Sequence, residues 1–305
     1  MQLQPFCELI RQRSGLLVGG GNGDMLEVAI TARLRATGAA DAAAYLRIVQ
    51  TDETEFQELL SHVTINETYF FREPAQISFL AEQVMPGLLA KRKESDPVRI
   101  LSAGCSTGEE PYSIAIALTE AFGTGISRRV SIVGGDIDHH ALVVAQRAIY
   151  GDFSFRAMPP ELKARHFARA GTRSHVLAPA IRAMVEYHQM NLISAPLLPA
   201  STGPFDVVFF RNVSIYFDTP TRRTIQEGFR SIMGEGSLLF LGISETLAND
   251  LGVFRMVETQ NIFHFVNGTA DVPPSAARIR PPVARKTPSP PPPIPFRKPV
   301  AFPTP

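Results

Sequence analysis

Apolar residues recur at helical spacing through the first ninety residues of the chain. Phe56, Leu59 and Leu60 fall on one face of such a segment, and Asp52 stands directly before it, where an aspartate can cap a helix. Similar segments precede it, and Pro74 suits the first turn of a further helix running toward Ala90. The pattern predicts an all-helical N-terminal part.

From Val98 onward the pattern changes to short apolar runs separated by segments of helical periodicity. The runs expected to be buried strands are Val98–Ala103, Val130–Gly134, Phe205–Phe210 and Ser237–Leu241. Buried strands that alternate with helices predict a doubly wound α/β fold, with a parallel sheet covered on both faces. A last run, Asn261–Val266, is expected to form an edge strand.

One stretch of the second part does not follow this alternation. The residues from Phe153 to Met190 are better explained as a small inserted β-subdomain, with strands near Val176 and Val185. The expected organisation is then a helical domain over 1–90, an α/β domain over 91–268 with an insertion at about 155–190, and a tail over 269–305.

Composition separates that tail from the rest. It contains 13 of the 25 prolines and carries a net charge of +5, whereas residues 1–90 carry −5. Such a proline-rich segment is predicted to be disordered, although it offers a surface for an additional partner. The whole chain has a net charge of only +1, which argues against a nucleic-acid partner.

The two cysteines provide no disulfide framework, and no signal peptide or membrane-spanning apolar stretch is evident. We therefore expect a cytoplasmic protein without membrane insertion. The seven histidines are scattered, and the pair His139–His140 has no companion ligand nearby in the sequence. No metal site is expected.

A glycine turn follows the first predicted strand. Gly104 and Gly108 allow a tight turn before a helix, and Glu109 and Glu110 occupy the start of that helix. Carboxylates there would repel a pyrophosphate but suit a ligand with hydroxyls, an amine or a sulfonium, which favours S-adenosylmethionine over NAD. Alternatively, both glutamates only interact with the helix dipole.

An acidic residue ends the second predicted strand. In nucleoside-binding α/β folds a carboxylate at this position accepts hydrogen bonds from the ribose hydroxyls, which is the role expected of Asp136. Asp138 is better explained as the N-cap of the next helix.

Two further stretches carry polar residues at positions that suit a ligand. Arg211, Asn212 and Tyr216 follow a buried strand, at the edge of the sheet where ligands bind. Tyr216 also has a simpler interpretation, as a packing residue of the next helix. Asn66 and Arg72 lie between two predicted helices, in a segment that is otherwise explained as an interdomain connection.

Taken together, these stretches resemble the CheR family of chemotaxis receptor glutamate methyltransferases over residues 1–268. The matching motifs are Asn66–Arg72 (NETYFFR), Ser102–Ser113 (SAGCSTGEEPYS), Asp136–Asp138 (DID), Arg211–Asp218 (RNVSIYFD) and Gly242–Leu247 (GISETL).

The resemblance implies a helical N-terminal domain followed by a Rossmann-like methyltransferase sheet that binds S-adenosylmethionine and releases S-adenosylhomocysteine. It places Arg72 and Tyr216 beside the reacting centre. The cofactor contacts that it implies, together with Gly104 of the glycine turn, are Asn66, Thr68, Arg72, Glu110, Asp136, Asn191, Leu192, Arg211 and Asn212. The assignment of Asn191 and Leu192 as cofactor contacts rests on a short match to the family.

The implied reaction is methylation of glutamate side chains in the cytoplasmic domain of a chemoreceptor-like protein. The resemblance also implies that the acceptor docks on a basic face of an N-terminal helix. The chain departs from the family here, because the helix over residues 24–35 keeps only Arg33 and Arg35 as cations, so electrostatic docking of an acidic receptor helix is not expected to be strong. Two other functions stay open at this point: a regulatory module that senses S-adenosylmethionine, and a methyltransferase whose acceptor is a small molecule or a nucleic acid.

Overall fold

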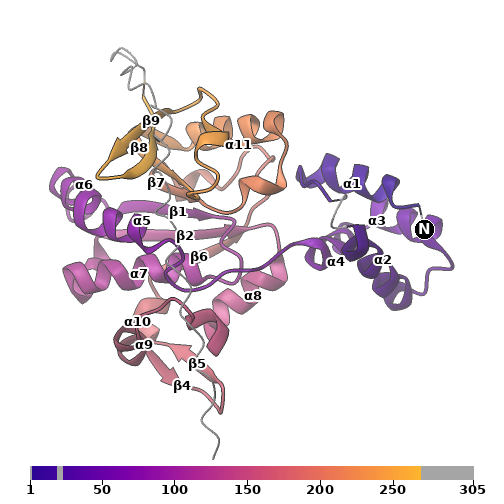
Figure 1. Ribbon diagram of the computed structural model, residues 1–305, viewed down its shortest axis with the longest axis horizontal. Coiled ribbons are helices and arrows are strands. Elements are labelled where there is room, and N and C mark those ends of the chain that lie inside the picture. Colours follow the sequence, from indigo (N-terminus) through magenta and orange to yellow (C-terminus); the bar gives the residue numbers. More distant parts are fainter. Residues whose placement is uncertain (1, 19–22, 269–305) are drawn as a thin grey trace, which may run out of the picture. The chain divides into compact units, whose positions relative to one another are not determined.

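The computed structural model describes residues 2–18 and 23–268 of the chain (Figure 1). The proline-rich tail predicted over 269–305 lies outside the described residues.

Four helices make up the N-terminal part of the structure. They are α1 (Gln4–Ser14), α2 (Gly23–Thr37), α3 (Ala42–Thr51) and α4 (Glu53–Val63). The side chains of Asp41 and Asp52 accept hydrogen bonds from the first turns of α3 and α4, which confirms the predicted cap at Asp52. The apolar faces of the four helices pack around Phe6, Tyr45 and Leu60, each of which is fully buried.

A longer helical segment follows the connection after α4. Pro74 begins it, as predicted, and it runs as α5 (Pro74–Phe79), a single π-helical turn η2 (Leu80–Val84) and α6 (Met85–Lys91). Its buried side chains, including Ile77 and Leu80, belong to the core on one face of the sheet.

The sheet has seven strands in the order β6-β2-β1-β7-β8-β10-β9, seen near the centre of Figure 1. Its strands are β1 (Val98–Ala103), β2 (Val130–Asp136), β6 (Val185–Gln189), β7 (Phe205–Phe210), β8 (Met233–Leu241), β9 (Arg255–Thr259) and β10 (Ile262–Val266). The first five in spatial order run parallel, and β10 pairs antiparallel with both β8 and β9. The predicted strands β1 and β7 are confirmed to the residue.

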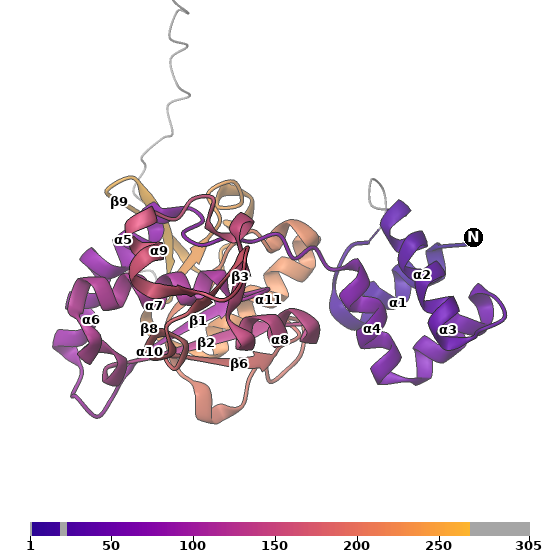
Figure 2. The ribbon, with the colours of Figure 1, turned by 90° about the horizontal axis from the view of Figure 1, so that it is seen from below.

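Successive side chains of each strand point to opposite faces of the sheet, and helices pack against the apolar side chains on both faces. Ile100 belongs to the core that includes α5 and α7 (Glu109–Phe122), whereas Leu101 belongs to the core that includes α11 (Thr219–Ser231). Helix α8 (His139–Arg147) follows β2 and contacts β6. Figure 2 shows the sheet and its helices from below.

Two predictions about strands are wrong. The strand near Val185 is β6, which pairs with β2 in the large sheet and not with the strand near Val176. The run ending at Val266 is β10, which lies between β8 and β9, so β9 forms that edge. The inserted region carries a separate sheet in the order β3-β5-β4, made of β3 (Ile149–Gly151), β4 (Phe167–Arg169) and β5 (Ser174–Leu177), and it also carries α9 (Pro160–His166) and α10 (Pro179–Arg182).

The chain order of the strands creates a point where the sheet reverses its direction of growth. From β1 the chain adds β2 and β6 on one side, and then returns to add β7 on the other side of β1. In open α/β sheets, ligands bind beyond the carboxyl ends of the strands at such a reversal. Gly104, Asp136 and Arg211 follow or end β1, β2 and β7 and therefore meet there.

Candidate functional site

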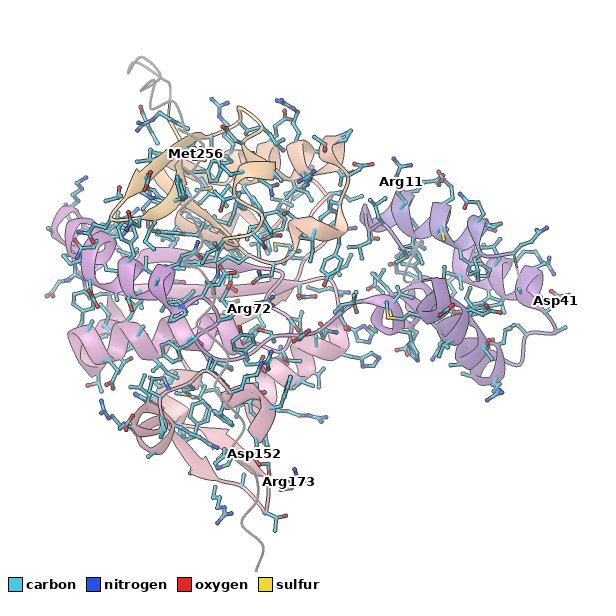
Figure 3. The ribbon with its side chains drawn as sticks, viewed as in Figure 1. Arg11, Asp41, Arg72, Asp152, Arg173 and Met256 are labelled. Carbon is cyan, nitrogen blue, oxygen red and sulfur yellow. The ribbon has the colours of Figure 1, made fainter. Side chains whose placement is uncertain are left out.

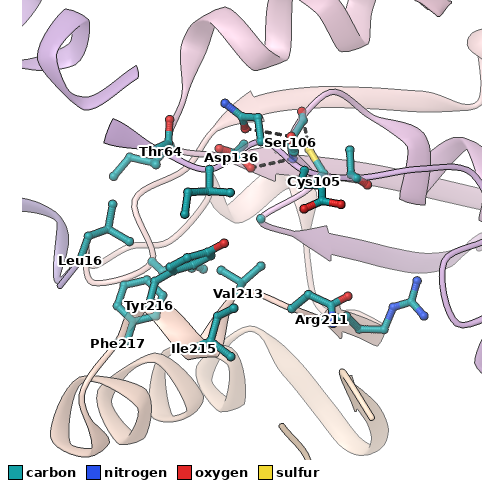
Figure 4. A pocket seen from close by; sticks show the side chains of 18 of the residues that line it. Leu16, Thr64, Cys105, Ser106, Asp136, Arg211, Val213, Ile215, Tyr216 and Phe217 are labelled. Atoms are coloured by element: carbon teal, nitrogen blue, oxygen red, sulfur yellow. Dashed lines mark hydrogen bonds between the residues drawn. The ribbon is translucent and has the colours of Figure 1, made fainter. Parts of the chain in front are cut away.

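A cavity of about 260 Å³ opens at the carboxyl ends of β1, β2 and β7 (Figure 4). Most of the residues predicted to bind a cofactor or to act in catalysis line it. These are Asn66, Thr68, Arg72, Gly104, Glu110, Asp136, Leu192, Arg211, Asn212 and Tyr216. Residues from four separate motifs are thus brought to one site.

The glycine turn forms part of the cavity wall by bringing the backbone close to its neighbours. Gly104 has a φ of +74°, and a Cβ atom there would lie 2.5 Å from Cγ2 of Val213. Its amide and that of Cys105 both donate to the carbonyl of Gly135, which ties the turn to the end of β2. Only glycine meets both the backbone conformation and the space at position 104.

Asp136 presents a buried carboxylate to the cavity. It is 8% exposed and accepts hydrogen bonds from the amide of Ser106, at 2.7 Å, and from the amide of Asp138, at 2.9 Å. Burial raises the pKa of Asp136 to about 6, although these amides oppose the rise. The carboxyl is therefore ionised at neutral pH, and its two oxygens retain lone pairs that can accept from ligand hydroxyls.

Asp138 has the structural role predicted for it. Its carboxylate caps α8 by accepting from the amide of His140, and it also accepts from Ser61, Thr64 and Asn66. Burial opposes its ionisation, but these hydrogen bonds lower the pKa of Asp138 below its ordinary value. This carboxylate therefore ties the segment after α4 to the start of α8.

The two glutamates of the glycine turn point to different places. Glu110 lines the cavity, where its Oε1 accepts from Ser102 at 2.7 Å and its Oε2 from the Nε of Arg211 at 2.7 Å. Glu109 is buried away from the cavity, where Thr107 and Ser154 donate to it, and burial raises its pKa. A role limited to the helix dipole therefore does not describe Glu110.

Arg211 is a cation held almost entirely inside the protein, with 5% of its surface exposed. Besides Glu110, its Nη1 donates to Oε1 of Gln76 at 3.1 Å and to the carbonyl oxygen of Glu73 at 3.3 Å. A buried guanidinium with several acceptors has a fixed orientation. Arg211 consequently holds the Glu110 carboxylate in place at the cavity.

A buried glutamate outside the cavity organises the loop that carries Asn212 and Tyr216. Glu245 is 2% exposed, and its carboxylate accepts from the amide of Asn212, from Oγ of Ser214 at 2.7 Å and from the amide of Gly242 at 3.0 Å. Asn212 has a φ of +59°, an uncommon conformation for a residue with a side chain. The hydrogen bonds to Glu245 stabilise it.

Tyr216 and Arg72 lie within electrostatic range of each other. Burial raises the pKa of the Tyr216 phenol, and the positive charge of Arg72 offsets part of that rise. The phenol is thus protonated at neutral pH and can donate. In Figure 4, Tyr216 and Ile215 lie on one side of the cavity, and Asp136 and Ser106 lie on the opposite side.

Arg72 differs from Arg211 in having an available charge. Its Nη1 donates to the backbone carbonyl oxygen of Glu67 at 3.1 Å. Within residues 2–18 and 23–268, no carboxylate lies within ion-pair distance of it. Figure 3 labels Arg72 in the middle part of the structure. Its guanidinium can still pair with a carboxylate brought from outside.

The structure also contains features that the motifs did not indicate. Leu16, Leu17 and Val18, which follow α1, line the cavity, and the amide of Leu17 donates to the carbonyl oxygen of Tyr216 at 2.9 Å. No pattern in the sequence marked this segment. Asn191, in contrast, does not line the cavity, because its side-chain amide donates to the backbone carbonyl oxygen of Arg13.

Cys105 carries a thiol in the glycine turn, and its environment makes that thiol unreactive. Burial raises the pKa of its thiol well above the ordinary value, and the nearby carboxylates of Asp136 and Glu110 raise it further. A thiol with a raised pKa is a poor nucleophile. Cys105 is therefore better explained as a small buried packing residue than as a catalytic one.

A cavity at the reversal of a doubly wound sheet, with a carboxylate at the end of the second strand, defines an α/β protein that binds a nucleoside cofactor. Comparison with protein families makes the class more specific. The family described as "CheR methyltransferase, all-alpha domain" matches residues 1–64, and the one described as "CheR methyltransferase, SAM binding domain" matches residues 66–263. The chain belongs to the CheR methyltransferase family, and its cofactor is S-adenosylmethionine.

Similar proteins carry corresponding names. The chain is 36% identical to a chemotaxis protein methyltransferase of Salmonella typhimurium over 82% of this chain and 85% of that protein. It is 34% identical to the chemotaxis protein methyltransferase of Escherichia coli, over 80% of this chain and 84% of that protein. It is also 34% identical to a probable biofilm formation methyltransferase, WspC, of Pseudomonas putida, over 91% of this chain and 64% of that protein.

In the part of the chain that the structure describes, no helix is both long enough and apolar enough to cross a membrane.

Proposed function

We propose that the protein transfers the methyl group of S-adenosylmethionine to glutamate side chains in the cytoplasmic domain of a chemoreceptor-like protein, forming methyl esters. The observation that carries this proposal is that the wall of the cofactor cavity contains both Arg72, whose charge is available, and the protonated phenol of Tyr216. A cation and a hydrogen-bond donor are the groups that would hold an incoming carboxylate. The chemotaxis relatives support the same acceptor class.

The side chains that line the cavity fit the cofactor. We assign Asp136 to the ribose hydroxyls, since its ionised carboxylate retains free acceptor positions, and Glu110 and Asn212 to polar groups of the methionine part. The bound cofactor supplies a methyl group on a positively charged sulfur. The carboxylates of Glu110 and Asp136 and the neutral acceptors beside them suit that charge.

Methyl transfer to a carboxylate requires little from the protein beyond positioning the carboxylate and the cofactor. An ionised glutamate carboxylate is already a nucleophile, so no general base is needed. Methyl transfer removes both a negative and a positive charge, and a poorly solvated cavity favours that change. We assign to Arg72 the task of orienting the acceptor carboxylate, and to Tyr216 a hydrogen bond that aligns the reacting groups.

The decisive test is to identify the chemical bond that joins the transferred methyl group to the acceptor. The protein is incubated with methyl-labelled S-adenosylmethionine and with receptor cytoplasmic domains from the same cell, and the product is then treated with mild alkali. Carboxyl methyl esters release the label as volatile methanol, and acceptors in which the modified glutamates are changed to alanine should take up no label. Label that survives alkali would show another linkage. Cofactor binding without transfer to any receptor would favour the sensor function instead.

A further inference from the structure

A cluster of two histidines and one glutamate lies outside the cofactor cavity. His139 and His140 begin α8, and Glu58 belongs to α4, 82 positions before His140. Oε1 of Glu58 lies 3.0 Å from Nε2 of His140 and 3.5 Å from Nε2 of His139. The sequence offered no companion for the histidine pair, but folding brings one from another helix.

These separations suit the coordination of one metal ion. One ligand atom from each of the three side chains lies within 4.8 Å of the others. Zinc bonds of about 2.0–2.1 Å in tetrahedral geometry place neighbouring ligand atoms about 3.3 Å apart. The two distances to Glu58 Oε1 bracket that value, so small side-chain rotations would bring the three atoms around one ion.

A neighbouring cation orients the glutamate ligand. Nη1 of Arg33 donates to Oε2 of Glu58 at 3.2 Å, which leaves Oε1 for the histidines. Arg33 is itself held by two hydrogen bonds to Glu55, of 2.8 and 2.6 Å. Fixed partners of this kind hold metal-binding side chains in position.

The helix dipole and the nearby carboxylates have opposite effects on a cation at this position. The positive end of the α8 dipole disfavours a cation at the start of this helix. The Asp138 carboxylate caps the same helix end by accepting from the amide of His140, and Glu58 adds a second carboxylate beside it. The imidazoles of His139 and His140 are 35% and 56% exposed, so an ion can reach them from solvent.

We propose that Glu58, His139 and His140 form a binding site for Zn²⁺ or a chemically similar late transition metal ion. Two imidazoles and one carboxylate are a typical ligand set for such ions. An ion bound there links α4 to α8 beside the segment of Asn66, which lines the cofactor cavity. The simpler alternative is a hydrogen bond from His140 to Glu58 with no ion.

Isothermal titration calorimetry of tag-free, chelator-treated protein with Zn²⁺ separates these alternatives. We expect one equivalent to bind, and His140→Ala and Glu58→Gln each to weaken binding more than about tenfold. Glu58→Gln is the sharper variant, because glutamine still accepts a hydrogen bond from His140 but is a poor metal ligand. His188→Ala is the matched control, since His188 lies 2.9 Å from Glu186 in a pair with a single imidazole; it should bind zinc as the unaltered protein does.

Two further measurements distinguish loss of metal binding from loss of folding in the variants. The melting temperature measured in chelator shows whether each variant is folded, and substitution with Co²⁺ should give visible absorption bands that are lost in Glu58→Gln. The proposal is overturned if the unaltered protein binds no zinc, or if all variants bind it equally.

Discussion

At the scale of single residues, the protonation of Asp136 should control the affinity for the cofactor product. Its pKa is raised to about 6 by burial, and ribose hydroxyls would donate only to the ionised form, so protonation competes with binding. Binding of S-adenosylhomocysteine should be level above pH 7 and about tenfold weaker at pH 5. Calorimetry across this range checks the prediction. Asp136→Asn should bind weakly at every pH, and a level profile in the unaltered protein would contradict the assignment.

Arg72 and Tyr216 are predicted to affect turnover more than folding. Both face the cavity, and Arg72 makes only one backbone hydrogen bond, so its removal costs little stability. Arg72→Ala and Tyr216→Phe should each lower methyl ester formation by about 10- to 100-fold, because they remove groups that position the reactants. Tyr69→Phe is a suitable control, since the Tyr69 ring lies 5.7 Å from the Arg72 guanidinium. Near-normal rates with unchanged melting temperatures would remove both residues from the mechanism.

At the scale of elements, Glu245 connects the loop after β8 to the loop after β7. Glu245→Gln keeps one acceptor oxygen but turns an NH₂ group toward donors that need acceptors. We expect a loss of about 1–3 kcal/mol in the free energy of unfolding and weaker S-adenosylhomocysteine binding. Urea denaturation and calorimetry measure the two effects. Glu245→Asp, which keeps the charge, should recover more of the cofactor affinity than Glu245→Gln; the opposite order would show that the carboxylate does not position the loop.

The sequence was informative about elements wherever one local pattern determined them. Strands β1 and β7 were predicted to the residue because they are buried apolar runs with clear ends. Strand β6 was given the wrong neighbours, because its half-buried sequence (VEYHQ) resembles an isolated strand as much as a strand at the edge of a sheet. Pairing between distant segments leaves no local signal. Strand β9 pairs with its neighbour in the chain, β10, across the turn at Gln260 and Asn261, and it was missed because its sequence (RMVET) is largely exposed and contains no buried apolar run.

The same distinction applies to the site. Gly104, Asp136 and Arg211 were predictable because strand ends converge in this fold. The wall formed by Leu16, the support from Glu245 and the approach of Glu58 to His140 depend on tertiary packing. The motif containing Glu245 matched the family, but its letters did not indicate that the carboxylate is buried and acts on another loop.

At the scale of the whole molecule, the placement of charge determines which surfaces can attract an acidic acceptor. Residues 1–90 carry a net charge of −5. The structure further shows that Arg33 is engaged by Glu55 and Glu58, which leaves Arg35 as the exposed cation of α2 among its described side chains. Asp24 and Glu27 are exposed on the same helix. Electrostatic attraction to this helix is therefore weak.

This arrangement predicts that the charge of Arg35 contributes little to acceptor binding. Arg35→Glu should change the KM for a receptor domain by less than about threefold, because a single exposed charge is screened by water and salt. Arg72→Glu, which places a negative charge where the acceptor carboxylate would bind, should abolish transfer under the same conditions. Initial rates at low and moderate ionic strength give both values. A tenfold or larger increase in KM for Arg35→Glu, with kcat unchanged, would show that α2 attracts the acceptor despite the acidic surroundings, and would make Arg35 the principal docking cation.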